Sequence, residues 1–255
     1  MSKADFSRGE FADRLRRARE GMAQAGLDWL IAIHPVSIHW LTGSDAKSYQ
    51  EFQCLLVGAG DEPMVVLTRQ GEVHEFETDS LADEVVGWGG GMVEDPVAAF
   101  DQLARRHGLM QARVGLEVPG YYLDPHHYLR LRDVLGAALV AEPTNLIADM
   151  KLVKSPAEIA CIRRAAAIAD VALDAFAGAL GEGTTELALA GIVYGTLLGA
   201  GSGIAASPIN LVSGPRSAYS HGAPTERVLQ RGDFGSIEFG ATFRRYTSTI
   251  GRQGS

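Results

Sequence analysis

Residues 232–253 read GDFGSIEFGATFRRYTSTIGRQ, a pattern that is typical of a β-hairpin. The apolar residues around Ile237 predict the first strand, and the β-rich run 246–250 predicts the second. Gly240 is expected to interrupt the first run, because glycine weakens strands and marks turns. The stretch therefore indicates that this part of the chain folds as antiparallel β-structure.

Glu238 brings a carboxylate into the first strand, between Ile237 and Phe239. An unpaired carboxylate is costly to bury among apolar side chains, so its presence needs a reason. One interpretation is a structural glutamate whose charge is paired. The other is a site residue whose surroundings tune its proton affinity. The hairpin sequence leaves both interpretations open.

The region before the hairpin carries strong helix signals. Ser155 is a good N-cap, Pro156 suits the first helical position, and Glu158 completes a capping box. The expected elements are a long helix from Pro156 to about residue 180, a second helix after 183–186 that ends at 199–203, an extended stretch at 208–213, and a loop that carries His221. Two helices followed by strands predict an α+β domain over residues 150–255.

The first part of the chain has a different order, in which strands alternate with helices. An α/β domain is therefore expected over residues 1–143, with a linker at 142–149. The expected helices are 8–26, a short helix from His34 to Gly43, and 70–82, 96–107 and 125–135; the expected strands are 28–33, 52–57, 63–67, 113–118 and 138–142, with 52–57 and 63–67 forming a hairpin.

Composition excludes several classes of function. The net charge of −8 argues against nucleic acid and anionic membranes as partners. Cys54 and Cys161 are not arranged as a disulfide scaffold or a CxxC motif, which fits a reducing compartment. The N-terminus has no secretory signal pattern, and no apolar run approaches the ~20 residues that span a bilayer. The sequence therefore predicts a cytoplasmic globular protein.

Four motifs occur in order: KLVKSPAEI at 151–159, SGPRSAYSH at 213–221, RGD at 231–233 and IEFG at 237–240. With the two helices between them, they resemble the creatinase and Xaa-Pro peptidase family. That resemblance covers nearly the whole chain. It implies a creatinase-like N-terminal domain followed by the first half of a "pita-bread" catalytic domain, with the chain stopping inside that domain.

The resemblance also implies where the chemistry lies. In the metallopeptidase members the hairpin supplies two Asp ligands to a two-metal site, and Glu238 and Thr249 stand at those positions. A neutral threonine does not bridge divalent ions as a carboxylate does, and the remaining ligands would lie beyond residue 255. The expected metal pair is therefore broken.

Creatinase and ectoine hydrolase represent a metal-free branch of the family that hydrolyses C–N bonds with carboxylate and His chemistry. By that resemblance, Glu238 is a candidate nucleophile or general base and His221 a candidate proton shuttle. An imidazole can accept a proton from water and donate one to a leaving nitrogen. A solvated loop residue is the alternative for His221.

The polar and aromatic stretch at 43–53 is a further candidate. The resemblance implies a homodimer in which the N-terminal domain of one subunit leans over the active site of its partner. Lys47 could then hold a substrate carboxylate, and Tyr49 could form a wall of the pocket. The alternative is an ordinary solvated loop.

Three hypotheses about function follow. The first is a creatinase-like hydrolase of a C–N bond in a small amidine-type or imino-acid substrate, acting without a metal cofactor. The second is an Xaa-Pro dipeptidase or aminopeptidase that uses Mn, Zn or Co, with Glu238 as a ligand. The third is a non-catalytic fragment that acts as a binding or assembly partner, because half of a catalytic domain would expose apolar surface.

Overall fold

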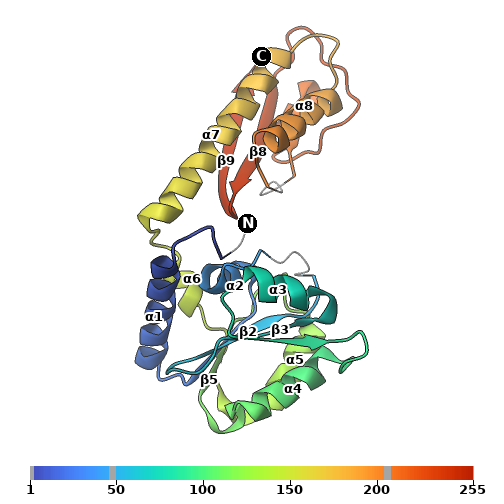
Figure 1. Ribbon diagram of the computed structural model, residues 1–255. Helices are drawn as coiled ribbons and strands as arrows, with labels where there is room; N and C mark the ends of the chain where they lie inside the picture. Colours follow the sequence, from blue (N-terminus) through green and yellow to red (C-terminus); the bar gives the residue numbers. More distant parts are fainter. Residues whose placement is uncertain (1–2, 46–49, 204–207, 255) are drawn as a thin grey trace. The chain divides into compact units, whose positions relative to one another are not determined.

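The computed structural model describes residues 3–45, 50–203 and 208–254. The chain divides into two compact units, Met1–Val153 and Lys154–Ser255 (Figure 1). The stretch expected to be a linker, 142–149, falls within the first unit. It contains most of a short helix, α6 (Leu146–Met150), which buries Ile147 against the core of that unit.

In the described part of the first unit, six strands form one mixed sheet in the order β4-β3-β2-β1-β5-β6. β1 pairs antiparallel with β2 and parallel with β5, so strands of both directions meet at the centre. The strands are β1 (Trp29–Ala32), β2 (Cys54–Gly58), β3 (Val65–Arg69), β4 (Glu84–Trp88), β5 (Val114–Leu116) and β6 (Leu139–Ala141). The α/β prediction for this part of the chain agrees with this architecture.

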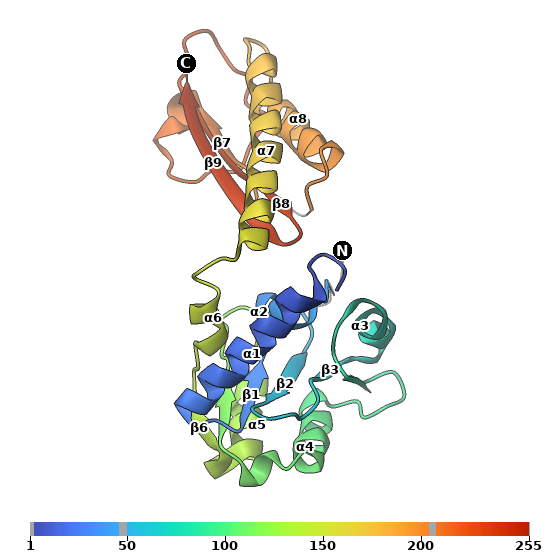
Figure 2. The same cartoon turned by 60° about the vertical axis from the view of Figure 1, so that its left-hand side comes forward.

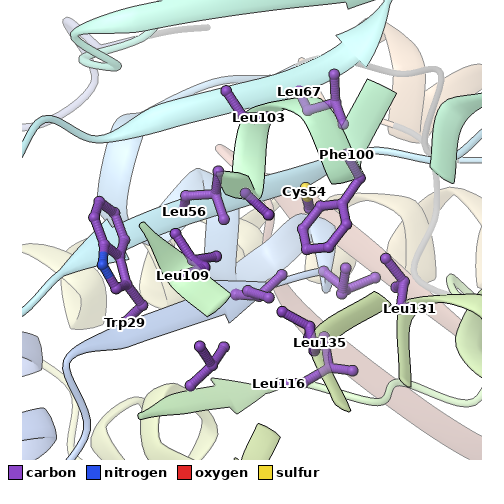
Figure 3. Close-up of a cluster of buried hydrophobic side chains, with 14 of the residues drawn as sticks. Trp29, Cys54, Leu56, Leu67, Phe100, Leu103, Leu109, Leu116, Leu131 and Leu135 are labelled. Atoms are coloured by element: carbon purple, nitrogen blue, oxygen red, sulfur yellow. The ribbon is translucent and has the colours of Figure 1, made fainter. Parts of the chain in front are cut away.

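Helices cover both faces of this sheet, which explains the continuous apolar strand sequences. Trp29 and Ile31 lie in one buried cluster, and Leu30 and Ala32 lie in another on the opposite face. Figure 3 shows the first cluster, which includes Phe100 and residues from several strands. The helices are α1 (Arg8–Ala25), α2 (Pro35–Thr42), α3 (Val73–Asp79), α4 (Pro96–Arg106), α5 (Pro125–Leu135) and α6. Helices α4 and α5 contribute to the first cluster and the other four to the second.

Local sequence explains most of these boundaries. Helix α1 begins after Ser7, whose hydroxyl accepts a hydrogen bond from the Glu10 amide, and ends at Gly26, whose φ of 64° is left-handed. One strand, β4, was not predicted. It is a half-buried edge strand that contains a glycine, Gly87, so neither a fully apolar run nor a regular alternation marks it.

In its described residues, the second unit packs two helices on a three-stranded antiparallel sheet, as the α+β prediction requires. Its elements are α7 (Pro156–Ala179), α8 (Glu186–Gly199), β7 (Asn210–Ser213), β8 (Gly235–Phe243) and β9 (Tyr246–Gly254), in the sheet order β7-β8-β9. Figure 2 shows α7 lying along the sheet. The predicted capping box is confirmed: the Ser155 hydroxyl accepts from the Glu158 amide at 3.2 Å, and the Glu158 carboxylate accepts from the Ser155 amide at 2.7 Å.

The hairpin differs from the prediction in one respect. Gly240 does not interrupt the first strand, because β8 continues through it to Phe243. The turn consists of Arg244 and Arg245, with φ values of 50° and 64°. Two consecutive left-handed residues are typical of a type I′ hairpin turn, whose twist matches that of the flanking strands. The core therefore receives side chains from the full length of β8.

Phe239 provides a test of this core. Its side chain is fully buried against α7 and α8, so Phe239→Ala should lower the free energy of unfolding by about 3–5 kcal/mol. Phe234→Ala is the matched control, since Phe234 is 44% exposed and should cost only about 0.5 kcal/mol. Urea unfolding followed by circular dichroism measures both; equal losses would contradict the assignment of Phe239 to the core.

Candidate functional site

Successive side chains of β8 point alternately into the core and to a polar face of the sheet. Ile237 and Phe239 point into the core, so Glu238 points to the opposite side of the sheet. Asn210 of β7 and Gly251 of β9 are its cross-strand partners. The expected burial of Glu238 is not observed. Its side chain is 42% exposed on this face. A carboxylate in an apolar strand sequence is tolerated here because it faces solvent.

The structure brings His221 to Glu238. His221 lies in the loop between β7 and β8, and its Nε2 is 4.0 Å from Oε2 of Glu238. Nδ1 of the same ring is 3.4 Å from the Ser220 hydroxyl. The imidazole is 67% exposed, so it is open to a ligand and to water. The two residues that the sequence singled out as catalytic candidates thus lie side by side.

A cavity of about 400 Å³ opens beside Glu238 on the polar face of the sheet. Its lining includes one acidic residue, one basic residue and several neutral polar residues, which suits a small polar molecule. The lining residues are Asn210, Val212, Ser220, Gly222, Ser236, Ile237, Glu238, Gly251, Arg252 and Gln253. The arrangement can present a carboxylate and, at its margin, an imidazole to the same bound group.

The loop that carries His221 is held by a second carboxylate, that of Glu186 at the first position of α8. This side chain is completely buried. It accepts hydrogen bonds from the Ser213 hydroxyl at 2.7 Å, from the Thr225 hydroxyl at 2.7 Å and from the Thr225 amide at 2.9 Å. The Arg216 guanidinium donates to it as well and forms an ion pair. Four donors therefore compensate the buried charge.

These contacts decide the ionisation of Glu186. Burial alone would raise the pKa of this carboxyl, but the hydrogen bonds from Ser213 and Thr225 and the charge of Arg216 outweigh it. The net effect is a lowered pKa, so Glu186 is an anion at neutral pH. A neighbouring pair follows the same logic: the hydrogen bond from Arg227 lowers the pKa of Asp233.

Sequence reasoning missed Glu186 and Asn210 as site residues. Glu186 follows a threonine N-cap, and an acidic residue there is the ordinary signature of a helix start. Its role becomes visible only when the distant loop residues Arg216 and Thr225 are placed against it. Asn210 became a neighbour of Glu238 through the β7–β8 register, which no local pattern specifies.

The donor set on this face does not fit a two-metal site. Thr249 on β9 pairs with Gly240 on β8, so Thr249 lies on the same face as Glu238 and diagonal to it. The face thus offers one carboxylate and one neutral hydroxyl where two bridging carboxylates would be needed. In the described ranges 3–45, 50–203 and 208–254, no group of three or more His, Cys, Asp or Glu side chains is arranged to hold a metal ion.

Two of the candidate site residues, Lys47 and Tyr49, lie outside the described residues. Their proposed contacts with substrate stay predictions. Within the part of the chain that the structure describes, no helix is both long enough and apolar enough to cross a bilayer.

Comparison with known families gives two matches. The model of the Creatinase/Prolidase N-terminal domain matches residues 14–153, which is more than half of the chain. The model of Metallopeptidase family M24 matches residues 160–253. The two matched ranges follow the two compact units closely.

Individual proteins are similar to both units. An uncharacterized hydrolase/peptidase from Sinorhizobium fredii is 29% identical over 97% of this chain and 65% of its own length. Ectoine hydrolase from Halomonas elongata is 31% identical over 64% of this chain and 42% of its own length. The crystal structure of a dipeptidase from Mycobacterium ulcerans superposes with a TM-score of 0.79 at 26% identity, covering 98% of this chain and 66% of that protein.

The chain therefore spans less than two thirds of the length of these relatives. The fold agrees with that of the Mycobacterium ulcerans dipeptidase over nearly all of its residues, which with the two family matches confirms the predicted creatinase-like domain followed by part of a pita-bread domain.

The lowered pKa of Glu186 predicts how stability depends on pH. An unfolded Glu titrates at about pH 4.3, so the contribution of Glu186 is fully present above that pH and is lost as the pH falls through the lower folded pKa. Glu186→Gln should cost about 2 kcal/mol at pH 7. The difference in free energy of unfolding between Glu186→Gln and the wild type should narrow below about pH 4.3. Urea unfolding at stepped pH measures it; a difference that widens on acidification would contradict the ionisation argued here.

Proposed function

Because the chain belongs to the creatinase and Xaa-Pro peptidase family, we propose that it hydrolyses a C–N bond, with His221 and Glu238 as its catalytic residues. The observation that carries the proposal is the 4.0 Å approach of His221 Nε2 to Glu238 Oε2 at the edge of an open cavity. The relatives named as hydrolases and dipeptidases support the reaction class.

The proposed chemistry divides the proton transfers between the two residues. Glu238 accepts a proton from the attacking water, whose oxygen bonds to the carbon of the C–N group. A protonated His221 donates to the nitrogen as that bond breaks. Transfer of the proton from Glu238 to His221 then restores both groups. Direct attack by Glu238 on the carbon is the alternative role, and it would pass through a covalent intermediate.

Thr249 supports a reaction that does not depend on a metal. With the neutral Thr249 beside it, Glu238 is the one carboxylate among the described residues of the hairpin face, whereas bridging two divalent ions calls for a second. A small amidine-type substrate fits this reading, since the cationic amidinium group would pair with Glu238. The similarity to ectoine hydrolase over 64% of the chain is a second support.

A dipeptidase is the second candidate. The match to Metallopeptidase family M24 and the superposition on the Mycobacterium ulcerans dipeptidase favour it. In that case Glu238 would be a metal ligand, and the substrate would be an Xaa-Pro dipeptide. The neutral Thr249 is the feature of this chain that opposes it.

Variants of the pair test the proposal. Glu238→Gln and His221→Ala should each lower kcat by about 10²–10⁴-fold, because each removes one proton-transfer group. Glu226→Gln and His126→Gln are matched controls at exposed positions outside the cavity, and they should retain wild-type kcat. The assay measures release of product from creatine, ectoine and Ala-Pro. Full activity in either pair variant would refute its catalytic role.

Metal dependence separates the two candidates. If hydrolysis does not require a metal ion, dialysis against EDTA should leave kcat unchanged, and added Mn²⁺, Zn²⁺ or Co²⁺ should not increase it. The dipeptidase candidate requires the opposite result, in which EDTA abolishes hydrolysis of Ala-Pro and one of the three ions restores it. Metal content measured by mass spectrometry on the same samples verifies that the dialysis was complete.

A further inference from the structure

The loop that carries His221 is closed on itself by contacts at its two ends. Arg216 and Thr225 both donate to the Glu186 carboxylate, and His221 lies between them in sequence. Arg216 also donates to the Thr225 hydroxyl at 3.2 Å and to the carbonyl of Ala223 at 2.7 Å. The segment 216–225 is therefore a ring of chain fastened to one buried group.

A second set of contacts fastens the strands on either side of this ring. The Ser213 hydroxyl, at the end of β7, donates to Glu186 and accepts from Arg227 at 2.8 Å. Arg227 in turn pairs with Asp233, just before β8. The backbone of α8 joins as well, because the Glu186 amide donates to the Arg227 carbonyl at 3.1 Å. Helix α8, the loop and the end of β7 thus meet at Glu186, and Arg227 links this group to the chain just before β8.

We propose that Glu186 is a positioning residue that fixes His221 beside Glu238. It does not line the cavity, so it acts through the loop rather than on a bound molecule. His221 itself is exposed, and the contacts of its ring with described residues are both long, 3.4 Å to the Ser220 hydroxyl and 4.0 Å to the Glu238 carboxylate. The contacts of Arg216 and Thr225 with Glu186 therefore set where the imidazole lies. The catalytic part of this inference rests on the proposed function, whereas the control of the loop does not.

The chemistry of the contacts explains why the carboxylate is required. All four groups that approach its oxygens are donors, and a carboxylate is the side chain that only accepts. One carboxylate oxygen accepts from Ser213 and the other accepts the remaining three hydrogen bonds, so the NH₂ group of a glutamine would face at least one donor and leave it unpaired. Because Arg216 would lose its buried counter-charge, the ring 216–225 should open while the helices keep their packing.

The chain offers a matched control in Glu158. Like Glu186, it lies in the first turn of a helix of the second unit, and it is 3% exposed. Its carboxylate accepts from the Ser155 amide and from the Tyr246 hydroxyl, both at 2.7 Å. None of these partners belongs to the His221 loop. Glu158→Gln therefore removes a buried carboxylate of the same kind without touching 214–226.

Hydrogen exchange of the intact protein, measured by mass spectrometry, tests control of the loop. In Glu186→Gln the amides of 214–226 should exchange about tenfold faster or more. The amides of α7 at 165–173 lie in the core and report any accompanying loss of global stability. Glu158→Gln should leave the exchange of 214–226 unchanged. An unchanged exchange rate of 214–226 in Glu186→Gln, or the same acceleration of 214–226 in Glu158→Gln, would overturn the inference.

Kinetics test the catalytic consequence, with whichever of creatine, ectoine or Ala-Pro the wild type hydrolyses. Glu186→Gln should lower kcat by about tenfold or more and change KM by less than about threefold, because His221 is displaced while the cavity stays. Glu158→Gln should retain kcat in its folded fraction. Faster amide exchange of 214–226 with unchanged kcat would overturn the positioning role of Glu186. If the wild type hydrolyses none of the three, the proposed function fails, and the exchange result alone decides whether Glu186 controls the loop.

Discussion

The buried charge of Glu186 is the constraint on which the site of the second unit depends. A carboxylate without exposed surface is stable only while its donors stay in place, and here they come from three separate segments of the chain. Arg216 and Thr225 cannot move away without leaving that charge uncompensated. The fold therefore gives an exposed loop, which would otherwise be free to sample many conformations, a defined position next to β8.

Because the side chains of β8 alternate between two faces, this strand contributes both to the core and to the candidate site. Ile237 and Phe239 bind the sheet to α7 and α8, while Glu238 between them faces the cavity. The same geometry places Thr249 on the face of Glu238 and so gives that face one negative charge. One carboxylate beside an imidazole suits proton transfer, whereas two carboxylates would suit a pair of metal ions.

Local signals in the sequence explain the elements that were predicted correctly. Ser155, Pro156 and Glu158 specify the start of α7 through contacts within one turn, and Gly26 ends α1 because it adopts a left-handed φ. The errors arise where local preference is overruled by neighbours. Gly240 weakens a strand in isolation, yet β8 continues through it because β9 pairs along its whole length.

The sequence by itself determined most of the helices and strands, though not β4, because capping and periodicity are local properties. Its short motifs indicated the family and, through that resemblance, the candidates His221 and Glu238. The sequence also determined that position 249 of the hairpin is a neutral threonine. Only the tertiary structure decided that His221 meets Glu238, that Asn210 faces it, and that Glu186 holds the loop. These relations join residues far apart in the chain through strand register and a buried charge, and no local pattern encodes either of them.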